Sequence, residues 1–182
     1  NNICMNIIAD NIILDCQGYM IDGVDDGNGI YTEKTNITIK NCFVKDWGTG
    51  GYFYLSSDIK IINSTFNSNF GEGILFFSSS NNQVINSTFS YNYYGIINYN
   101  SNTQITNSTF FYNEGDGILI SYSSNVQITN STFKFNSFRG LNFFNSNNNV
   151  IYNNKIHDNS VGIYIEESYD NKFYNNLLNN TK

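Results

Sequence analysis

Proline is absent from the 182 residues, and histidine, tryptophan and arginine each occur once, as His157, Trp47 and Arg139. Charged residues make up 13% of the chain, and the formal net charge is −6. A surface so poor in cations cannot neutralise a phosphate backbone, so the composition excludes nucleic acid as a partner. Every apolar run is shorter than the roughly 18 residues that span a bilayer, and we expect no membrane insertion within this segment.

An initial methionine and a secretory signal are also missing, and we expect the chain to be the mature part or a segment of a longer protein. Its length suits a single domain over residues 1–182, and a hydrophobic content of 40% is enough for a core.

Cysteine is scarce: the three residues Cys4, Cys16 and Cys42 form no Cys-x-x-Cys pair and have no histidine neighbour. This pattern signals neither metal nor redox chemistry, and no cofactor is predicted. We expect the three side chains to be small buried hydrophobes, with a Cys4–Cys16 bridge as the open alternative.

What the sequence does contain is a repeat in three sets of residues. Large apolar residues recur at steps of 21 to 23 positions: Met20, Phe43, Phe66, Phe89, Phe110, Phe133, Ile156 and Leu178. Glycines followed by an apolar residue recur at steps of 22 or 23: Gly29, Gly51, Gly73, Gly95, Gly117, Gly140 and Gly162. Polar residues follow the first set by three positions: Asp46, Asn69, Asn92, Asn113, Asn136 and Asn159.

Each repeat holds three short β-prone pieces, such as "GILFF", "QVI" and "TFS" in residues 73–92, separated by Ser, Asn and Gly turns. A period of about 22 residues with three strands predicts one coil of a parallel β-solenoid. We therefore expect an all-β solenoid of about seven to eight coils, stacked about 4.8 Å apart. The absence of proline agrees, because every strand needs its N–H for a ladder.

The opening segment "IIADNIILDCQGYMIDG" (7–23) and later coils such as "GIYIEESYDNKFYNNLLNN" (162–180) resemble right-handed parallel β-helix repeat proteins of the pectate-lyase-like superfamily. The resemblance covers nearly the whole chain and implies the right-handed coil. It also implies an extracellular or cell-surface location. This superfamily includes pectin- and alginate-active enzymes, periplasmic proteins linked to copper enzyme maturation, and large archaeal and bacterial surface proteins.

The tetrapeptide "NSTF" occurs four times, beginning at Asn63, Asn86, Asn107 and Asn130. Although Asn-x-Thr is a glycosylation signal, four glycans one coil apart would collide. We expect these asparagines instead to form left-handed turns and to hydrogen-bond along the column, as the set from Asn69 to Asn159 also can. Asn36 and Asn179 are the better glycosylation candidates, because they lie near the ends.

No catalytic residue is predicted. Glu72, Asp116 and Arg139 share one column before the glycines, and we interpret Asp116 and Arg139 as a surface ion pair between coils. His157 and Asp158 are interpreted as a solvated pair. Asp22, Asp25 and Asp26 form a dense acidic turn that could hold Ca²⁺, although its spacing differs from that of an EF-hand and such residues are ordinary turn formers.

Aromatic residues are the most suggestive surface feature. Tyr91, Tyr112 and Phe135 share a column and are expected to point outward, where they could contact a protein neighbour or a glycan, or simply reflect β-propensity.

Together these features predict a non-enzymatic structural or adhesive module that binds other copies of itself, stacked end to end in a filament or surface layer, or neighbouring surface proteins. The alternative is a carbohydrate-active or glycan-binding β-helix.

Overall fold

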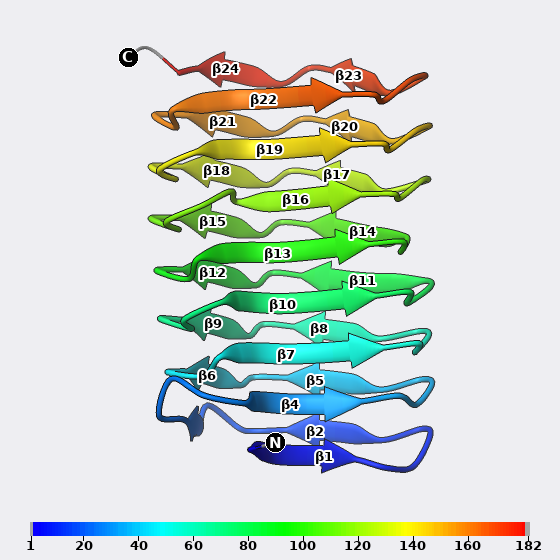
Figure 1. Ribbon diagram of the computed structural model, residues 1–182, viewed down its shortest axis with the longest axis vertical. Coiled ribbons are helices and arrows are strands. Elements are labelled where there is room, and N and C mark those ends of the chain that lie inside the picture. The colour runs from blue at the N-terminus through cyan, green and yellow to red at the C-terminus, as the bar shows by residue number, and fades with distance from the viewer. Residues whose placement is uncertain (1, 181–182) are drawn as a thin grey trace.

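The computed structural model describes residues 2–180, which form 24 strands in three parallel sheets of eight. Figure 1 shows the strands stacked along the long axis of the molecule, with one strand of each sheet in every coil. The parallel β-solenoid predicted from the repeat is therefore confirmed. No α-helix occurs in residues 2–180, so none is long and apolar enough to cross a membrane.

We name the sheets A, B and C in the order in which each coil visits them. Sheet A, which faces the viewer in Figure 1, contains β1 (Ile3–Ile7), β4 (Asn28–Thr32), β7 (Thr49–Tyr54), β10 (Glu72–Phe77), β13 (Tyr94–Tyr99), β16 (Ile118–Ser121), β19 (Arg139–Phe144) and β22 (Val161–Glu166). Sheet B contains β2 (Ile13–Asp15), β5 (Thr38–Lys40), β8 (Lys60–Ile62), β11 (Asn82–Ile85), β14 (Thr103–Thr106), β17 (Gln127–Thr129), β20 (Val150–Tyr152) and β23 (Lys172–Tyr174). Sheet C contains β3 (Met20–Asp22), β6 (Phe43–Lys45), β9 (Thr65–Asn67), β12 (Thr88–Ser90), β15 (Thr109–Phe111), β18 (Thr132–Lys134), β21 (Lys155–His157) and β24 (Leu177–Asn179).

Strand alternation places one side chain of each short strand in the core and its neighbours outside. In sheet C the inward residue is a phenylalanine in four successive coils, Phe66, Phe89, Phe110 and Phe133, and all four are fully buried. Their rings stack with centroids 4.8–5.4 Å apart and planes 6° apart. Complete burial of each ring stabilises the fold by about 1.5–3 kcal/mol.

The corners between sheets B and C explain the repeated tetrapeptide. Asn86 adopts φ 51°, which turns the chain, and the next residue, Ser87, is buried. The Ser87 hydroxyl oxygen accepts a hydrogen bond from the backbone N–H of Ser64 in the preceding coil, at 3.2 Å. The threonine then points outward and the phenylalanine inward. "NSTF" is thus a corner followed by a strand.

The asparagine ladder from Asn69 to Asn159 is confirmed, and it is buried. Each side-chain amide donates to the Oδ1 of the next asparagine along the axis, at 2.8–3.2 Å. The same Oδ1 atoms accept backbone N–H groups from the preceding coil. Because Asn92 also donates to the carbonyl oxygen of Phe66, its amide connects three coils.

For the four "NSTF" asparagines, the predicted left-handed turn is confirmed, but the predicted hydrogen bonds between their side chains are not. Asn63, Asn86, Asn107 and Asn130 have φ between 49° and 52° and are exposed. The predicted side-chain hydrogen bonds along their column are wrong, since none is formed within residues 2–180. An exposed amide is satisfied by water, whereas a buried one needs a protein partner.

Three register assignments in the first three coils are also wrong. Met20, predicted in the apolar column, is 52% exposed, and Ile21 lies below Val44 in its place. Phe43 pairs with Thr65, and Val44 lies below Phe66 in the core. Likewise Gly51 pairs with Ile74, and Gly50 occupies the glycine column, where an added Cβ would lie 2.6 Å from the carbonyl oxygen of Gly73. At each of these positions two similar residues are consecutive in the sequence. The inward–outward alternation of the strand decides which of the two faces the core.

The same shift places Trp47, not Asp46, below Asn69, whose Oδ1 accepts the Trp47 backbone N–H at 3.2 Å. The indole holds the column position that asparagines occupy in the following coils, and only 7% of Trp47 is exposed.

Both cysteine expectations are wrong. Cys16 and Cys42 form a disulfide, with Cα atoms 4.8 Å apart, and Cys4 is a free, exposed thiol. The bridge joins adjacent coils, because residues separated by 26 positions meet once the chain is coiled. Cys4 lies in β1 and Cys16 directly follows β2, and the two do not meet.

Candidate functional site: the aromatic outer surface

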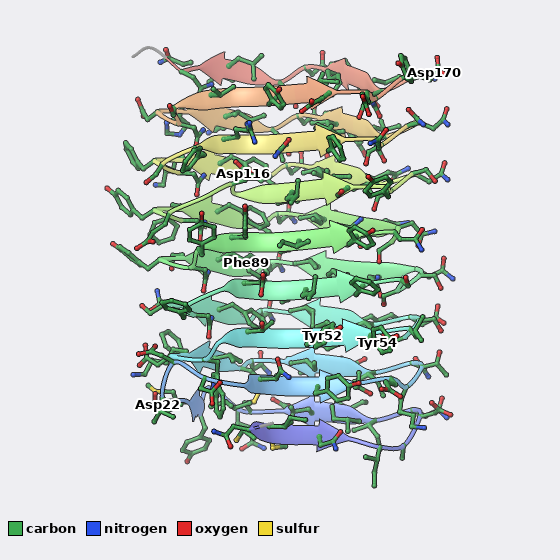
Figure 2. The ribbon with its side chains drawn as sticks, in the orientation of Figure 1. Asp22, Tyr52, Tyr54, Phe89, Asp116 and Asp170 are labelled. Atoms are coloured by element: carbon green, nitrogen blue, oxygen red, sulfur yellow. A yellow bond between two sulfur atoms is a disulfide. The ribbon has the colours of Figure 1, made fainter. Side chains whose placement is uncertain are left out.

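The outward residues of sheet A form rows that run along the solenoid axis, because the strands pair in register. One row is aromatic over most of its length and consists of Tyr54, Phe77, Tyr99, Tyr122 and Phe144. Successive ring centroids are 4.9–5.6 Å apart. Figure 2 labels Tyr52 and Tyr54 on β7, where the row begins. We call these five residues the sheet A row.

The sheet A row is interrupted in the coil of β16, where the register position is held by Ser121. Tyr122, the next residue, fills the gap: it has φ 50°, is 51% exposed, and contacts both Tyr99 and Phe144 edge to face. From β7 to β19 the row extends over about 20 Å, since adjacent strands are about 4.8 Å apart. This length matches several units of an extended polymer.

Two tyrosines beside the start of the row, Tyr31 and Tyr52, have a raised pKa. Burial raises the pKa of Tyr31 to about 12, and the hydrogen bond from its hydroxyl to Glu33 adds to the rise. Burial also raises the pKa of Tyr52, whose ring lies 5.5 Å from that of Tyr31. The face therefore combines apolar rings with neutral hydroxyl groups.

A polar edge borders sheet A where its strands begin. The hydroxyl of Thr49 donates to Glu72 at 2.9 Å, and Glu72 pairs in register with Tyr94. Farther along the axis, the Arg139 guanidinium lies over the ring of Tyr164, 4.1 Å from its centroid. Such a cation–π contact stabilises the arginine by about 0.5–2 kcal/mol.

Asp116 is the buried acid of this edge, and Figure 2 labels it near the start of β16. Its predicted ion pair with Arg139 is present, at 3.7 Å, but the expectation of a surface position is wrong because only 3% of the residue is exposed. Asp116 Oδ1 accepts the backbone N–H of Arg139 at 3.1 Å, and Oδ2 accepts from Asn142 at 2.7 Å. The carboxylate therefore ties adjacent coils together.

Burial raises the pKa of Asp116, and the Asn142 amide and the Arg139 guanidinium offset part of that rise. The charge on Asp116 in turn contributes, after burial, to the raised pKa of Tyr94.

The second aromatic surface is the predicted column of Tyr91, Tyr112 and Phe135, which we call the turn strip. The three side chains are 54%, 46% and 39% exposed. Their rings stack with centroids 5.5 and 5.1 Å apart. All three backbones are left-handed, with φ between 54° and 57°. Bulky residues rarely adopt this conformation, so the left-handed backbone at these three positions lowers the stability of the fold.

The predicted calcium turn does not converge on one point. Asp22 pairs with Lys45 at 3.2 Å, and Asp26 accepts the Gly27 backbone N–H and the Asn2 amide. Asp25 takes the left-handed turn conformation at φ 61°. Within residues 2–180, no three His, Cys, Asp or Glu side chains lie close enough together to hold a metal ion.

The remaining predicted positions lie apart from the aromatic surfaces. Asn36 has φ 55° and donates to Asn11 at 2.8 Å, while Asn179 is exposed in β24. His157 pairs with Asp158 at 2.7 Å and lies beside Lys134 in register.

The sheet A row was missed in the sequence, although a signal was present. Tyr54, Phe77, Tyr99 and Phe144 each follow the glycine of their coil by four positions once Gly50 is used for the third coil. A search for a recurrent aromatic residue at a fixed distance from the glycines would have found it.

Fold and surface together define a parallel β-solenoid with internal amide ladders and an aromatic outer surface. The sequence from residue 5 to residue 182 matches the NosD family, described as periplasmic copper-binding protein. The chain belongs to this family. A search of curated protein sequences found no match.

Solved structures share the fold at low sequence identity. The mannuronan C-5 epimerase AlgE6 A-module of Azotobacter vinelandii is 15% identical, with a TM-score of 0.76 over 98% of this chain and 55% of its own. The periplasmic alginate epimerase AlgG is 12% identical, with a TM-score of 0.75 over 100% of this chain and 44% of its own. Pectate lyase Pel9A is 17% identical, with a TM-score of 0.60 over 78% and 49%. The chain thus spans about half the length of these proteins.

Copper in proteins is held by thiolate, thioether and imidazole ligands. In this chain Cys16 and Cys42 are bonded to each other, and His157 is paired with Asp158. Cys4 and Met5 are neighbours in β1, so their side chains point to opposite faces of the strand. The residues that the structure describes therefore do not form a copper site.

Proposed function

We propose that this chain is a glycan-binding β-solenoid that holds an extended polysaccharide along the outer face of sheet A. The observation that carries the proposal is the sheet A row, a continuous line of aromatic rings parallel to the axis. The negative face of an aromatic ring attracts the C–H groups of a sugar ring, and exposed apolar surfaces of this size mark binding sites.

The named relatives support polysaccharide as the class of ligand. Their names say that they act on mannuronan, alginate and pectate, which are all linear polysaccharides. A linear polymer is also the ligand shape that matches a row about 20 Å long on a flat face. A filament-forming shaft would not require aromatic rings in one line on one side of the solenoid over five coils. The glycan-binding alternative therefore explains more of the surface than the mechanical one.

The proposed location is outside the cytoplasm. The family description is periplasmic, and the disulfide between Cys16 and Cys42 needs an oxidising compartment.

Catalysis is not part of the proposed function. Asp116 is only 3% exposed, and its two oxygens accept hydrogen bonds from Arg139 and Asn142, so the carboxylate is not accessible to a substrate on the surface. Incubation with alginate, pectate and neutral polymers is therefore expected to release no reducing or unsaturated ends.

Affinity electrophoresis through gels that contain one polysaccharide each would test the binding. Tyr122→Ala removes an exposed ring of the sheet A row, and we expect about tenfold weaker retardation, the equivalent of about 1.4 kcal/mol. Tyr174→Ala is the matched control, because Tyr174 is 46% exposed and stacks on Tyr152 at 5.1 Å, but on sheet B.

The control is expected to bind like the unaltered protein. Equal losses in both variants, or no retardation in any gel, would contradict the proposal. A thermal melt of each variant separates lost binding from lost folding.

A further inference from the structure

A hollow of about 580 Å³ opens at the corner between sheets C and A, away from the sheet A row. Its origin is a short turn between two longer ones. Ser90 and Gly95 are five positions apart, whereas their register equivalents Asn67 and Gly73, and Phe111 and Gly117, are six apart. The turn at residues 91–94 therefore projects less far from the solenoid than the turns of the preceding and following coils. Figure 1 shows these corners after β9, β12 and β15 along one edge of the molecule.

Three aromatic side chains line the hollow. Phe70, Tyr91 and Tyr93 are 78%, 54% and 44% exposed, so their rings are open to a ligand. One face of Tyr91 stacks on Tyr112 in the next coil. In the preceding coil its column position is held by Ser68, which is too small to cover the other face. Tyr91 is thus the end of the turn strip, and its free ring face borders the hollow.

The charged residues in the lining are both acidic. Both are exposed: Glu114 lies on the turn that follows the short one, and Asp25 lies at the far end of the hollow, on the turn between β3 and β4. Aromatic faces together with carboxylates attract cations, because ring quadrupoles and carboxylates both present negative charge. A uronic acid would be repelled here, and the net charge of −6 adds to that repulsion.

Backbone strain points to the same place. Tyr91 holds φ 57°, in a column where a small or amide residue would cost less. Phe70 is more exposed than any other phenylalanine in the described chain, although an exposed phenylalanine gains nothing in stability. Stacking on Tyr112 accounts for one face of Tyr91 only, and a ligand would cover the other face and the ring of Phe70.

We propose that this hollow binds a positively charged amino-sugar unit, with its ring packed on Tyr91, Tyr93 and Phe70 and its ammonium group facing Glu114. This inference rests on the proposed function in one respect only, namely that the ligand is a carbohydrate. It implies selectivity for glucosamine-type polymers over the uronic-acid polymers named for the structural relatives.

Isothermal titration with three oligosaccharides of equal length tests the inference: a glucosamine oligomer, its neutral N-acetylated form and an oligouronate. We expect the glucosamine oligomer to bind at least about tenfold more tightly than the neutral form, because a charge-assisted hydrogen bond is stronger than a neutral one. The oligouronate should bind most weakly. Equal affinity for all three would overturn the assignment.

Variants locate the site. Glu114→Gln removes one charge without changing shape and should remove most of the preference for the glucosamine oligomer. Glu167→Gln, an exposed acid in the turn after β22, is the matched control and should keep it. Tyr91→Asn should weaken all three ligands at this site, because asparagine suits the left-handed turn but offers no ring.

The two proposals fail separately. If the Tyr122 variant loses polymer binding while Glu114→Gln leaves selectivity unchanged, the sheet A row stands and the hollow does not. If Glu114→Gln abolishes the preference while Tyr122→Ala has no effect, the reverse holds.

Discussion

Two columns of asparagines run side by side through this solenoid, and they differ in almost everything except spacing. Asn113 is fully buried, and its amide is hydrogen-bonded to Asn136 and to the carbonyl oxygen of Phe89. Asn107, six positions earlier, is exposed, and its backbone is left-handed at φ 52°. The first residue is required for its side chain, and the second for the backbone conformation that its side chain tolerates.

The difference shows that a repeat in the sequence reports two distinct physical demands. In a buried column the same hydrogen-bonding side chain recurs in every coil, because an amide without a partner in the core is costly. In an exposed corner column only the left-handed backbone angle recurs, so several residue types can occupy these positions. In the turn strip, three aromatic residues hold such corners at φ 54–57°.

The largest effect is expected from breaking the buried column. Asn113→Ala removes the acceptor for the Asn92 backbone and side chain and the donor to Asn136. We expect the free energy of unfolding to fall by about 3 kcal/mol, because buried partners are left unpaired. Urea denaturation followed by circular dichroism measures the loss. A loss below about 1 kcal/mol would mean that the ladder is replaceable.

A smaller effect is expected at the exposed corner. Asn107→Ala should cost about 1 kcal/mol, since alanine pays for the left-handed angle that asparagine tolerates. Asn107→Gly is the control and should be nearly neutral, because glycine adopts positive φ freely. If both variants lose equal stability, the asparagine side chain rather than the angle is what matters at this corner.

An aromatic corner should respond less still. For Tyr91→Asn we expect a change in stability within about 0.5 kcal/mol, as relief of the left-handed strain offsets the lost stacking on Tyr112. Tyr152→Asn, which loses a similar stack on Tyr174 from a regular strand, should cost about 1 kcal/mol. The same denaturation curves compare the two. A loss at position 91 as large as that at 152 would show that the turn strip is packing rather than stored strain.

The smallest effect is a pH dependence at Asp116. Because burial raises its folded pKa above the unfolded value of 3.8, the folded state binds the proton more tightly, and this contribution to stability is lost as pH rises through the folded pKa. The free energy of unfolding of the unaltered protein, minus that of Asp116→Asn, should therefore fall as pH increases from 3.8 toward neutrality. A difference that grows with pH would show that the Arg139 pairing outweighs burial.

Much of the fold was predictable from spacing alone. From Phe66 onward the apolar and amide columns follow from the repeat, because one coil length governs all of them. The second coil was not predictable at residue level, since Phe43 and Val44 are both apolar and both β-prone. The choice between them depends on the alternation in three dimensions.

The rest of the site needed the structure for specific reasons. The Cys16–Cys42 bridge joins residues that become neighbours only once the coils stack. The hollow arises from turns that differ by one residue: the spacing from Ser90 to Gly95 shows the difference in the sequence, but not that it opens a hollow. The serine column from Ser64 to Ser131 could have been found, because each serine follows an "NSTF" asparagine and accepts a backbone N–H from the coil before.

A pair of double-mutant cycles tests most directly whether the two asparagine columns differ in kind. The first cycle replaces Asn113 and Asn136 with alanine singly and together, and the second does the same with Asn107 and Asn130. We predict a coupling energy of about 1 kcal/mol or more for the buried pair and less than about 0.5 kcal/mol for the exposed pair. Equal coupling in both cycles would contradict the account.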